Sequence, residues 1–89
     1  MNKQELYAKL RTRFGDVAQT IVAIEELSEL QKELCKWLRD SKRDITPIVE
    51  EIADVRIMIE QLQAMLGCDD CVEEIMKEKL QRTIDRYFK

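Results

Sequence analysis

The sequence predicts an all-α protein that folds as a single four-helix domain over residues 1–89. It contains only two glycines and one proline, and 45% of its residues are hydrophobic, which is typical of helical rather than disordered chains. No segment shows the period-two alternation of apolar and polar residues that marks a half-buried strand. A chain of this length is near the lower limit for a self-sufficient core, so we expect oligomerisation to complete the bundle.

Two helices are predicted in the first half of the chain. Apolar residues at helical spacing place the first helix at about residues 3–13. Gly15 suits the C-terminus of that helix, and the side chain of Asp16 is expected to cap the next one. The second helix is predicted to span about residues 17–39, and the polar segment RDSKRD (39–44) is predicted to be a loop.

Two further helices are predicted in the second half. Thr46 as N-cap and Pro47 at the first helical position favour the start of the third helix, which is expected to end at Gly67. The segment CDDCVEE is expected to open the fourth helix, with Asp70 and Glu73 at the spacing of a capping box. Five apolar residues share one stripe of that helix: Val72, Met76, Leu80, Ile84 and Tyr87. We therefore expect four helices in one compact unit.

The charge balance and hydropathy pattern exclude several classes of protein. A net charge of −3 and a pI near 5.0 argue against binding to a nucleic-acid polymer, which requires a basic surface. No N-terminal segment resembles a signal peptide, and the longest uninterrupted apolar run is only Ile21–Ile24. These observations predict a cytoplasmic protein that does not associate with membranes.

The three cysteines carry little functional signal. Cys68 and Cys71 form a CxxC pair, whereas Cys35 lies on another predicted helix, and the chain contains no histidine. This pattern favours an interhelix turn with reduced thiols over a zinc site or a thioredoxin-like redox pair. A zinc-stabilised interaction module remains a weaker alternative.

Acidic residues interrupt the apolar stretches of the second and third predicted helices. Glu26 and Glu29 lie roughly 60° apart on the second helix, at about 100° per residue. Glu51 and Asp54 have the same spacing on the third helix. Buried carboxylates without partners cost several kcal/mol each, so such a group persists where protons or cations neutralise it.

A metal site is one of two interpretations of these acids. Glutamate-rich helices are common on protein surfaces, where Glu29 could simply pair with Lys32. Two acidic pairs on antiparallel neighbouring helices would instead face each other. Because only oxygen donors are present, Mg²⁺, with Mn²⁺ able to replace it, is the better candidate than zinc.

The acidic segments also resemble a known family. EELSE (25–29) followed by EEIAD (50–54) resembles the EExxE…ExxD signature of the MazG-like all-α nucleoside triphosphate pyrophosphohydrolases. The similarity extends to VRIMIEQL and KEKLQR (77–82) and covers about residues 17–86. It implies a helical bundle that assembles as a homodimer or homotetramer. It also implies Mg²⁺-dependent hydrolysis of (d)NTP to (d)NMP and pyrophosphate.

The resemblance implies roles for the four acids. Glu26 and Glu29 match the first pair of metal ligands in the family motif, and Glu51 and Asp54 match the second pair. Bound cations would attach the triphosphate, which an acidic site alone would repel. Glu26 or Glu29 is also our candidate for the catalytic group that orients or deprotonates the attacking water.

Phosphate and base contacts are predicted with less support from the sequence. Lys79 and Arg82 match a basic pair in the last helix of the family, and Lys36 is a further phosphate-binding candidate. Arg82 could equally form an ordinary i,i+4 pair with a glutamate on its own helix. Trp37 could stack on a base, although a single tryptophan is more often a core or interface residue. Gln19 could hydrogen-bond the base or the sugar.

Three functions therefore remain open at this stage. The first is an (d)NTP pyrophosphohydrolase, and the second is a phosphoribosyl-ATP pyrophosphatase-like enzyme with the same acidic motif. The third is a non-catalytic helical adaptor whose apolar surfaces bind a partner chain. Dependence on Mg²⁺ and turnover would separate the enzymes from the adaptor, and a substrate panel would separate the two enzymes.

Overall fold

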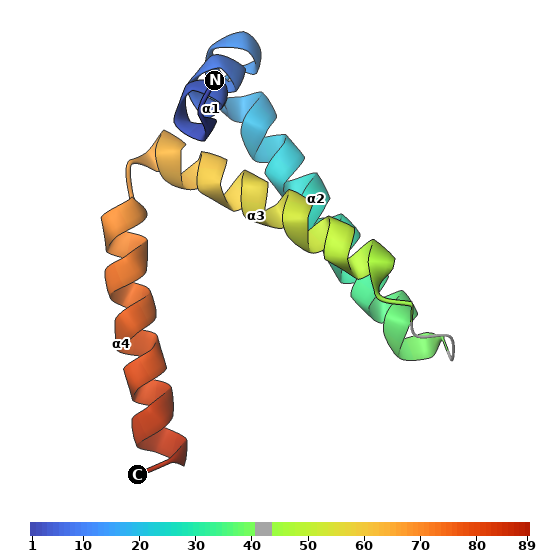
Figure 1. The fold of residues 1–89 in the computed structure, drawn as a ribbon, viewed down its shortest axis with the longest axis vertical. Helices are drawn as coiled ribbons and strands as arrows, with labels where there is room; N and C mark the ends of the chain where they lie inside the picture. The colour runs from blue at the N-terminus through green and yellow to red at the C-terminus, as the bar shows by residue number, and fades with distance from the viewer. Residues whose placement is uncertain (41–43) are drawn as a thin grey trace.

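The computed structural model describes residues 1–40 and 44–89 and shows an arrangement of α-helices (Figure 1). The helices are α1 (Lys3–Phe14), α2 (Asp16–Arg39), α3 (Thr46–Leu66) and α4 (Asp69–Tyr87). No strand occurs within these two described ranges, which confirms the all-α prediction. Residues 41–43 of the predicted loop lie outside the described residues.

The junction between α1 and α2 is tighter than predicted. Gly15, with φ of 86°, is both the C-cap of α1 and the N-cap of α2, so the break predicted at this glycine is confirmed. Asp16 is the first residue of α2 rather than its cap, and the predicted capping role of its side chain is wrong. The guanidinium of Arg11 instead binds the Asp16 carboxylate, donating from Nη2 to Oδ2 over 2.9 Å. This exposed ion pair bridges the turn between the two helices.

The start of α3 is shifted by one residue from the prediction. Ile45 occupies the N-cap position, Thr46 is the first helical residue, and Pro47 lies in the first turn. The capping role predicted for Thr46 is therefore wrong. Asp44 explains the difference, because its Oδ1 accepts a hydrogen bond from the backbone N–H of Thr46 at 3.0 Å.

The turn between α3 and α4 contains the predicted glycine. Gly67 is left-handed, with φ of 62° and ψ of 39°, as expected for a helix C-terminus. The backbone N–H groups of Gly67 and Cys68 both donate to the carbonyl of Gln63, which gives the turn a defined geometry. The capping box predicted for Asp70 and Glu73 is not formed, since Cys68 is the N-cap of α4 and no side chain caps that end.

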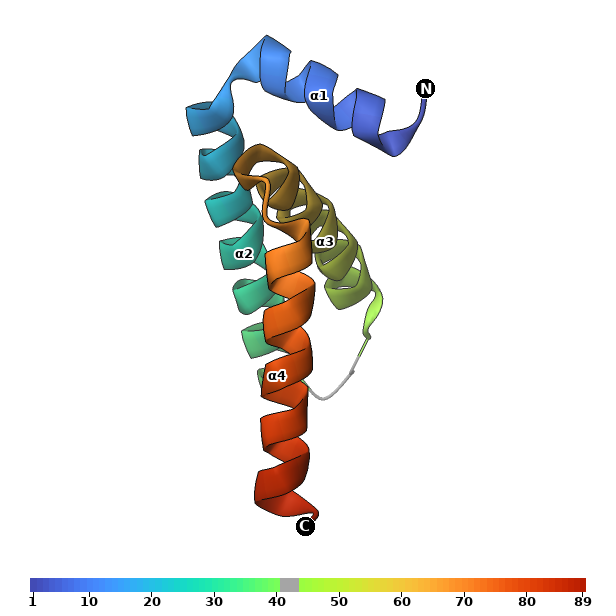
Figure 2. The same ribbon diagram turned by 90° about the vertical axis from the view of Figure 1, so that its left-hand side faces the viewer.

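Packing within the chain is concentrated between α2 and α3. These two long helices lie side by side over most of their length, and α1 crosses near one end of the pair (Figures 1 and 2). Tyr7 attaches α1 to α3, because its hydroxyl donates to Glu60 Oε1 at 2.8 Å. Lys3 Nζ binds Glu60 Oε2 at 2.9 Å. The buried side chains among the described residues are those of Tyr7, Ala23, Val55 and Met58.

The fourth helix does not join this core. α4 leaves the end of α3 at an angle (Figure 1). It packs against the other helices far less than α2 and α3 pack against each other. Its predicted stripe is solvent-exposed in the chain, with Leu80 62% and Tyr87 67% accessible. The single chain therefore contains the four predicted helices but not the predicted compact unit, because α4 does not pack into the core formed by the other helices.

No helix in the described parts of the chain combines the length and apolar character needed to cross a bilayer.

Candidate functional site

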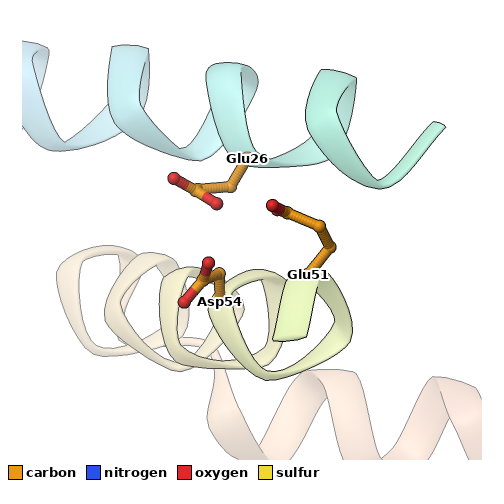
Figure 3. Close-up of side chains that lie close together, drawn as sticks. All are labelled: Glu26, Glu51 and Asp54. Carbon is orange, nitrogen blue, oxygen red and sulfur yellow. The ribbon is translucent and has the colours of Figure 1, made fainter. Parts of the chain in front are cut away.

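Three acidic side chains converge between α2 and α3. Glu26 projects from α2 toward Glu51 and Asp54, which lie one turn apart on α3 (Figure 3). Each residue offers a carboxylate oxygen, and these oxygens lie within 4.8 Å of one another. Side-by-side packing of the two helices is what brings residues so distant in sequence together. We call Glu26, Glu51 and Asp54 the acidic triad.

The electrostatic environment of the acidic triad is unfavourable for three negative charges. Glu26 and Glu51 are partly buried, whereas Asp54 is exposed. Burial is the largest cause that raises the pKa of the Glu26 carboxyl above its usual range, followed by the negative charges of Asp54 and then Glu51. No basic residue is among the causes of this shift. The triad is thus a place where a proton or a cation is favoured.

One atom of the triad is left without a hydrogen-bond partner. Oε2 of Glu51 is buried and accepts no hydrogen bond from the described residues. A buried carboxylate oxygen without a donor is costly, and a hard cation would satisfy it. Three converging oxygen donors fit the ligand chemistry of Mg²⁺, which takes a few carboxylates and completes its coordination with waters and phosphate oxygens. The residues present therefore fit a divalent cation.

Glu29 is placed differently from the other predicted metal ligands. Its side chain is exposed, and it does not belong to the group of mutually close oxygens formed by the acidic triad. Three residues separate Glu29 from Glu26, which moves it roughly 4.5 Å along α2 and about 60° around the axis. Glu29 thus borders the triad at the surface.

Lys36 and Trp37 lie toward the far end of α2 from the first helix. They line a cavity of about 210 Å³ together with residues near the start of α3, and Lys36 Nζ is 3.5 Å from Glu33 Oε1. Ten residues separate Lys36 from Glu26, or roughly 15 Å along a helix. Within one chain, Lys36 and Trp37 are therefore remote from the acidic triad.

Gln19 lies on the opposite side of the triad from Trp37. It lines a larger cavity, of about 510 Å³, between α1, the start of α2 and the second half of α3. Its Nε2 is 3.5 Å from the carbonyl oxygen of Leu10, a long contact that tethers it to α1. The two predicted base contacts, Gln19 and Trp37, are eighteen residues apart on α2, roughly 27 Å, so one base cannot contact both within one chain.

The larger cavity is also lined by residues that were not predicted to belong to a site. Tyr7 and Gln61 contribute polar groups, whereas Met58, Leu62 and Met65 provide an apolar wall from α3. The apolar wall follows from the helical stripe that also carries Asp54, but no sequence signal shows that α1 closes the cavity. That closure depends on the hydrogen bond from Tyr7 to α3.

Lys79 and Arg82 lie on the exposed helix α4. Because α4 diverges from the α2–α3 pair, the structure of the single chain does not bring either side chain to the acidic triad.

Comparisons with protein-family models, with curated proteins and with solved structures found no match to this chain.

Proposed function

We propose that this protein is a Mg²⁺-dependent nucleoside triphosphate pyrophosphohydrolase of the MazG-like type. The observation that carries the proposal is the convergence of the carboxylates of Glu26, Glu51 and Asp54. Within this group, the buried Oε2 of Glu51 accepts no hydrogen bond from the described residues. An arrangement that costs free energy in the metal-free protein is expected where function requires it. In this proposal the protein acts as a homodimer or homotetramer.

The position of the larger cavity supports a nucleotide substrate. Met58 in its wall is four residues beyond Asp54 on α3, roughly 6 Å along the helix. Its volume of about 510 Å³ is in the usual range for small-molecule sites. Amide groups of Gln19 and Gln61 beside an apolar wall suit a nucleobase, which presents hydrogen-bonding edges and apolar faces. A nucleoside in this cavity would leave its phosphates near the acidic triad.

The roles of the side chains follow from their positions. Glu26, Glu51 and Asp54 would hold Mg²⁺, which on binding neutralises the triphosphate and the leaving pyrophosphate. Glu29 or Glu26 would accept a proton from a water molecule as it attacks phosphorus. The bond between the α- and β-phosphates then breaks, and the products are a nucleoside monophosphate and pyrophosphate.

The proposal is tested by pyrophosphate release from a panel of ribo- and deoxyribonucleoside triphosphates and phosphoribosyl-ATP. Turnover should require Mg²⁺ and stop with EDTA, and Asp54→Asn should lower kcat/KM by about 10²-fold or more. Glu74→Gln removes one charge from an exposed position on α4 and should leave turnover unchanged. Turnover of phosphoribosyl-ATP alone would assign the alternative enzyme of the same type. Absence of turnover and of Mg²⁺ binding in folded protein would refute the proposal.

A non-catalytic helical adaptor is the second candidate. The exposed apolar stripe of α4 favours it, since a different partner chain could cover that surface. An adaptor predicts that Asp54→Asn leaves partner binding intact and that Mg²⁺ does not stabilise the protein. The enzyme proposal predicts that the same change strongly lowers both turnover and the stabilisation by Mg²⁺.

A further inference from the structure

Two cysteines lie on the first turn of α4, directly after the left-handed Gly67. Cys68 is the N-cap of this helix, and Cys71 is its third residue. The backbone N–H of Val72 donates to the carbonyl of Cys68 at 2.9 Å, which closes the turn. The sequence alone favoured reduced thiols at this position. The structure adds that both thiols belong to a single turn whose backbone is held by a hydrogen bond.

The separation of the two cysteines suits a disulfide. The distance between their Cα atoms is set by the backbone of the two residues between them, Asp69 and Asp70, which are both helical. Residues three positions apart on a helix differ by roughly 4.5 Å along the axis and about 60° around it, so their Cα atoms lie about 5 Å apart. Disulfides join residues whose Cα atoms are usually about 4.4–6.8 Å apart. A bond between Cys68 and Cys71 therefore needs rotation of the side chains and little movement of the backbone.

Both thiols are free, and they differ in their access to solvent. Cys71 is exposed, whereas Cys68 is half-buried. The turn around them is open, since Leu66 is 68% exposed and a Cβ added at Gly67 would meet no atom within 4 Å. Thiol–disulfide exchange begins when an accessible thiolate attacks an external disulfide. The exposed Cys71 is therefore the first of the two to react.

The described parts of the chain do not turn this pair into a metal site. Among the described residues, no group of three or more close metal-ligating side chains includes Cys68 or Cys71. A structural zinc site needs four ligands, and the chain has no histidine. Gln19 lines the same cavity as Met65 near the end of α3, and Cys35 is sixteen residues beyond Gln19, roughly 24 Å along α2. The third thiol of the chain is therefore out of reach of the other two.

The residues next to the pair in sequence carry only negative charge. Residues 66–76 contain four acids and neither lysine nor arginine. The acids are Asp69, Asp70, Glu73 and Glu74. Such a cluster attracts a cationic molecule and repels an anionic one, and salt screens both effects. A disulfide of positive charge is therefore the favoured reaction partner.

We propose that Cys68 and Cys71 are a reversible redox pair that a cationic disulfide oxidises. The Cys71 thiolate attacks one sulfur of that molecule, which forms a mixed disulfide and releases a first thiol. The Cys68 thiolate then attacks the Cys71 sulfur, which closes a ring across the first turn of α4 and releases a second thiol. Two electrons pass from the protein to the external disulfide, and the protons of the two cysteines pass to the released thiols. The redox pair does not depend on the proposed function.

The redox pair is tested by mass spectrometry of the full chain after treatment with cystamine, a cationic disulfide. Trypsin leaves both cysteines of the pair in one peptide, residues 57–77, and places Cys35 in another, residues 33–36. The peptide 57–77 should lose both thiol hydrogens, resist alkylation and carry no cysteamine, and dithiothreitol should restore its two thiols. Cys35 should instead carry a mixed disulfide. A peptide 57–77 that carries two cysteamine groups, keeps two free thiols or is joined to another chain would overturn the proposal.

Single substitutions separate the roles of the two thiols. Cys68→Ser should keep a stable mixed disulfide on Cys71, because the thiol that displaces it is missing. Cys71→Ser should react several-fold more slowly, since the remaining thiol of the pair is half-buried. Cys35→Ser is the matched control and should form the disulfide as the wild type does. Equal rates for Cys71→Ser and Cys68→Ser would overturn the assignment of Cys71 as the attacking thiol.

The preference for a cationic partner is tested with two oxidants. At low ionic strength, cystamine should oxidise the pair several-fold faster than the anionic glutathione disulfide, and salt should reduce this ratio. Asp69→Asn combined with Asp70→Asn should also reduce it, whereas Asp85→Asn, roughly 21 Å along α4 from Cys71, should not. A ratio that neither salt nor the double substitution changes would overturn the assignment of a cationic partner.

Discussion

Replacement of Glu51 by glutamine is expected to stabilise the metal-free protein. At a separation of 4.8 Å, two unit charges repel by about 0.9 kcal/mol in bulk water and by about 3.5 kcal/mol at an effective dielectric constant of about 20. Glu51→Gln removes two of the three repulsions within the acidic triad. Because Asp54 is exposed and the pKa of Glu26 is already raised, we expect a gain near the lower end, about 1–3 kcal/mol.

Thermal unfolding followed by circular dichroism measures this gain. In EDTA, Glu51→Gln should raise Tm by at least about 4 °C, since 1 kcal/mol corresponds to roughly 4–8 °C for a domain of this size. Addition of about 10 mM Mg²⁺ at constant ionic strength should stabilise the wild type by about 1.4 kcal/mol for a Kd of about 1 mM. The variant should gain much less, because it lacks one of the three ligands.

Glu74→Gln is the matched control for this experiment. It makes the same chemical change at an exposed position on α4 and should respond to Mg²⁺ as the wild type does. A metal-free Glu51→Gln protein that is less stable than the wild type would show that the triad is not repulsive. An equal Mg²⁺ response in wild type and Glu51→Gln would show that the triad is not the cation site.

Two further predictions concern the attachment of α1 and the turn before α4. In a Tyr87→Phe variant, where Tyr7 is the only tyrosine left, the phenol should titrate with a pKa of about 12 in ultraviolet absorbance. Burial raises this pKa most and Glu60 adds to it, so Glu60→Gln should lower the midpoint without returning it to 10. Because the folded state holds the Tyr7 proton more tightly, this contribution to stability is complete below pH 10 and is lost as pH rises toward 12. At the turn, Gly67→Ala should lower the free energy of unfolding by about 1 kcal/mol in urea denaturation, because φ is +62° and an added Cβ would meet no atom within 4 Å. Gly67→Asn should lower it less, because asparagine adopts the left-handed conformation more readily. Equal stability of all three proteins would contradict the left-handed conformation.

Local signals in the sequence determined the helices and most of their ends. The helical spacing of apolar residues indicated the helices. Two glycines, Gly15 and Gly67, indicated where helices end, because a helix terminus needs a particular backbone conformation at one residue. The capping predictions failed at Asp16 and Thr46. At Asp16 the carboxylate is bound by Arg11, and at Thr46 the backbone N–H donates to Asp44, so a neighbouring side chain made a contact that the caps did not anticipate. Such contacts depend on which side chains meet after the chain has turned.

The candidate site was partly visible in the sequence. Helical periodicity indicated that four acids, Glu26, Glu29, Glu51 and Asp54, interrupt or border faces that pack, since spacing along one helix fixes direction around its axis. Only the packing of α2 against α3 decided that three of these carboxylates meet within 4.8 Å and that Glu29 stays at the surface. The unbroken course of α2 separates Gln19 from Trp37, the two predicted base contacts, by eighteen residues along one helix.

The sequence alone thus determined the helical class, the helix breaks and the acidic character of two facing segments, because these depend on interactions between residues close in the chain. Tertiary structure decided which acids converge, that α1 closes a cavity beside them, and that α4 projects with its apolar stripe uncovered. The physical reason is that contacts between distant residues depend on the path of the chain, which turns between α3 and α4 at the left-handed Gly67. Periodicity predicts which face of a helix needs a partner, but the path of the chain determines whether that partner lies in the same molecule.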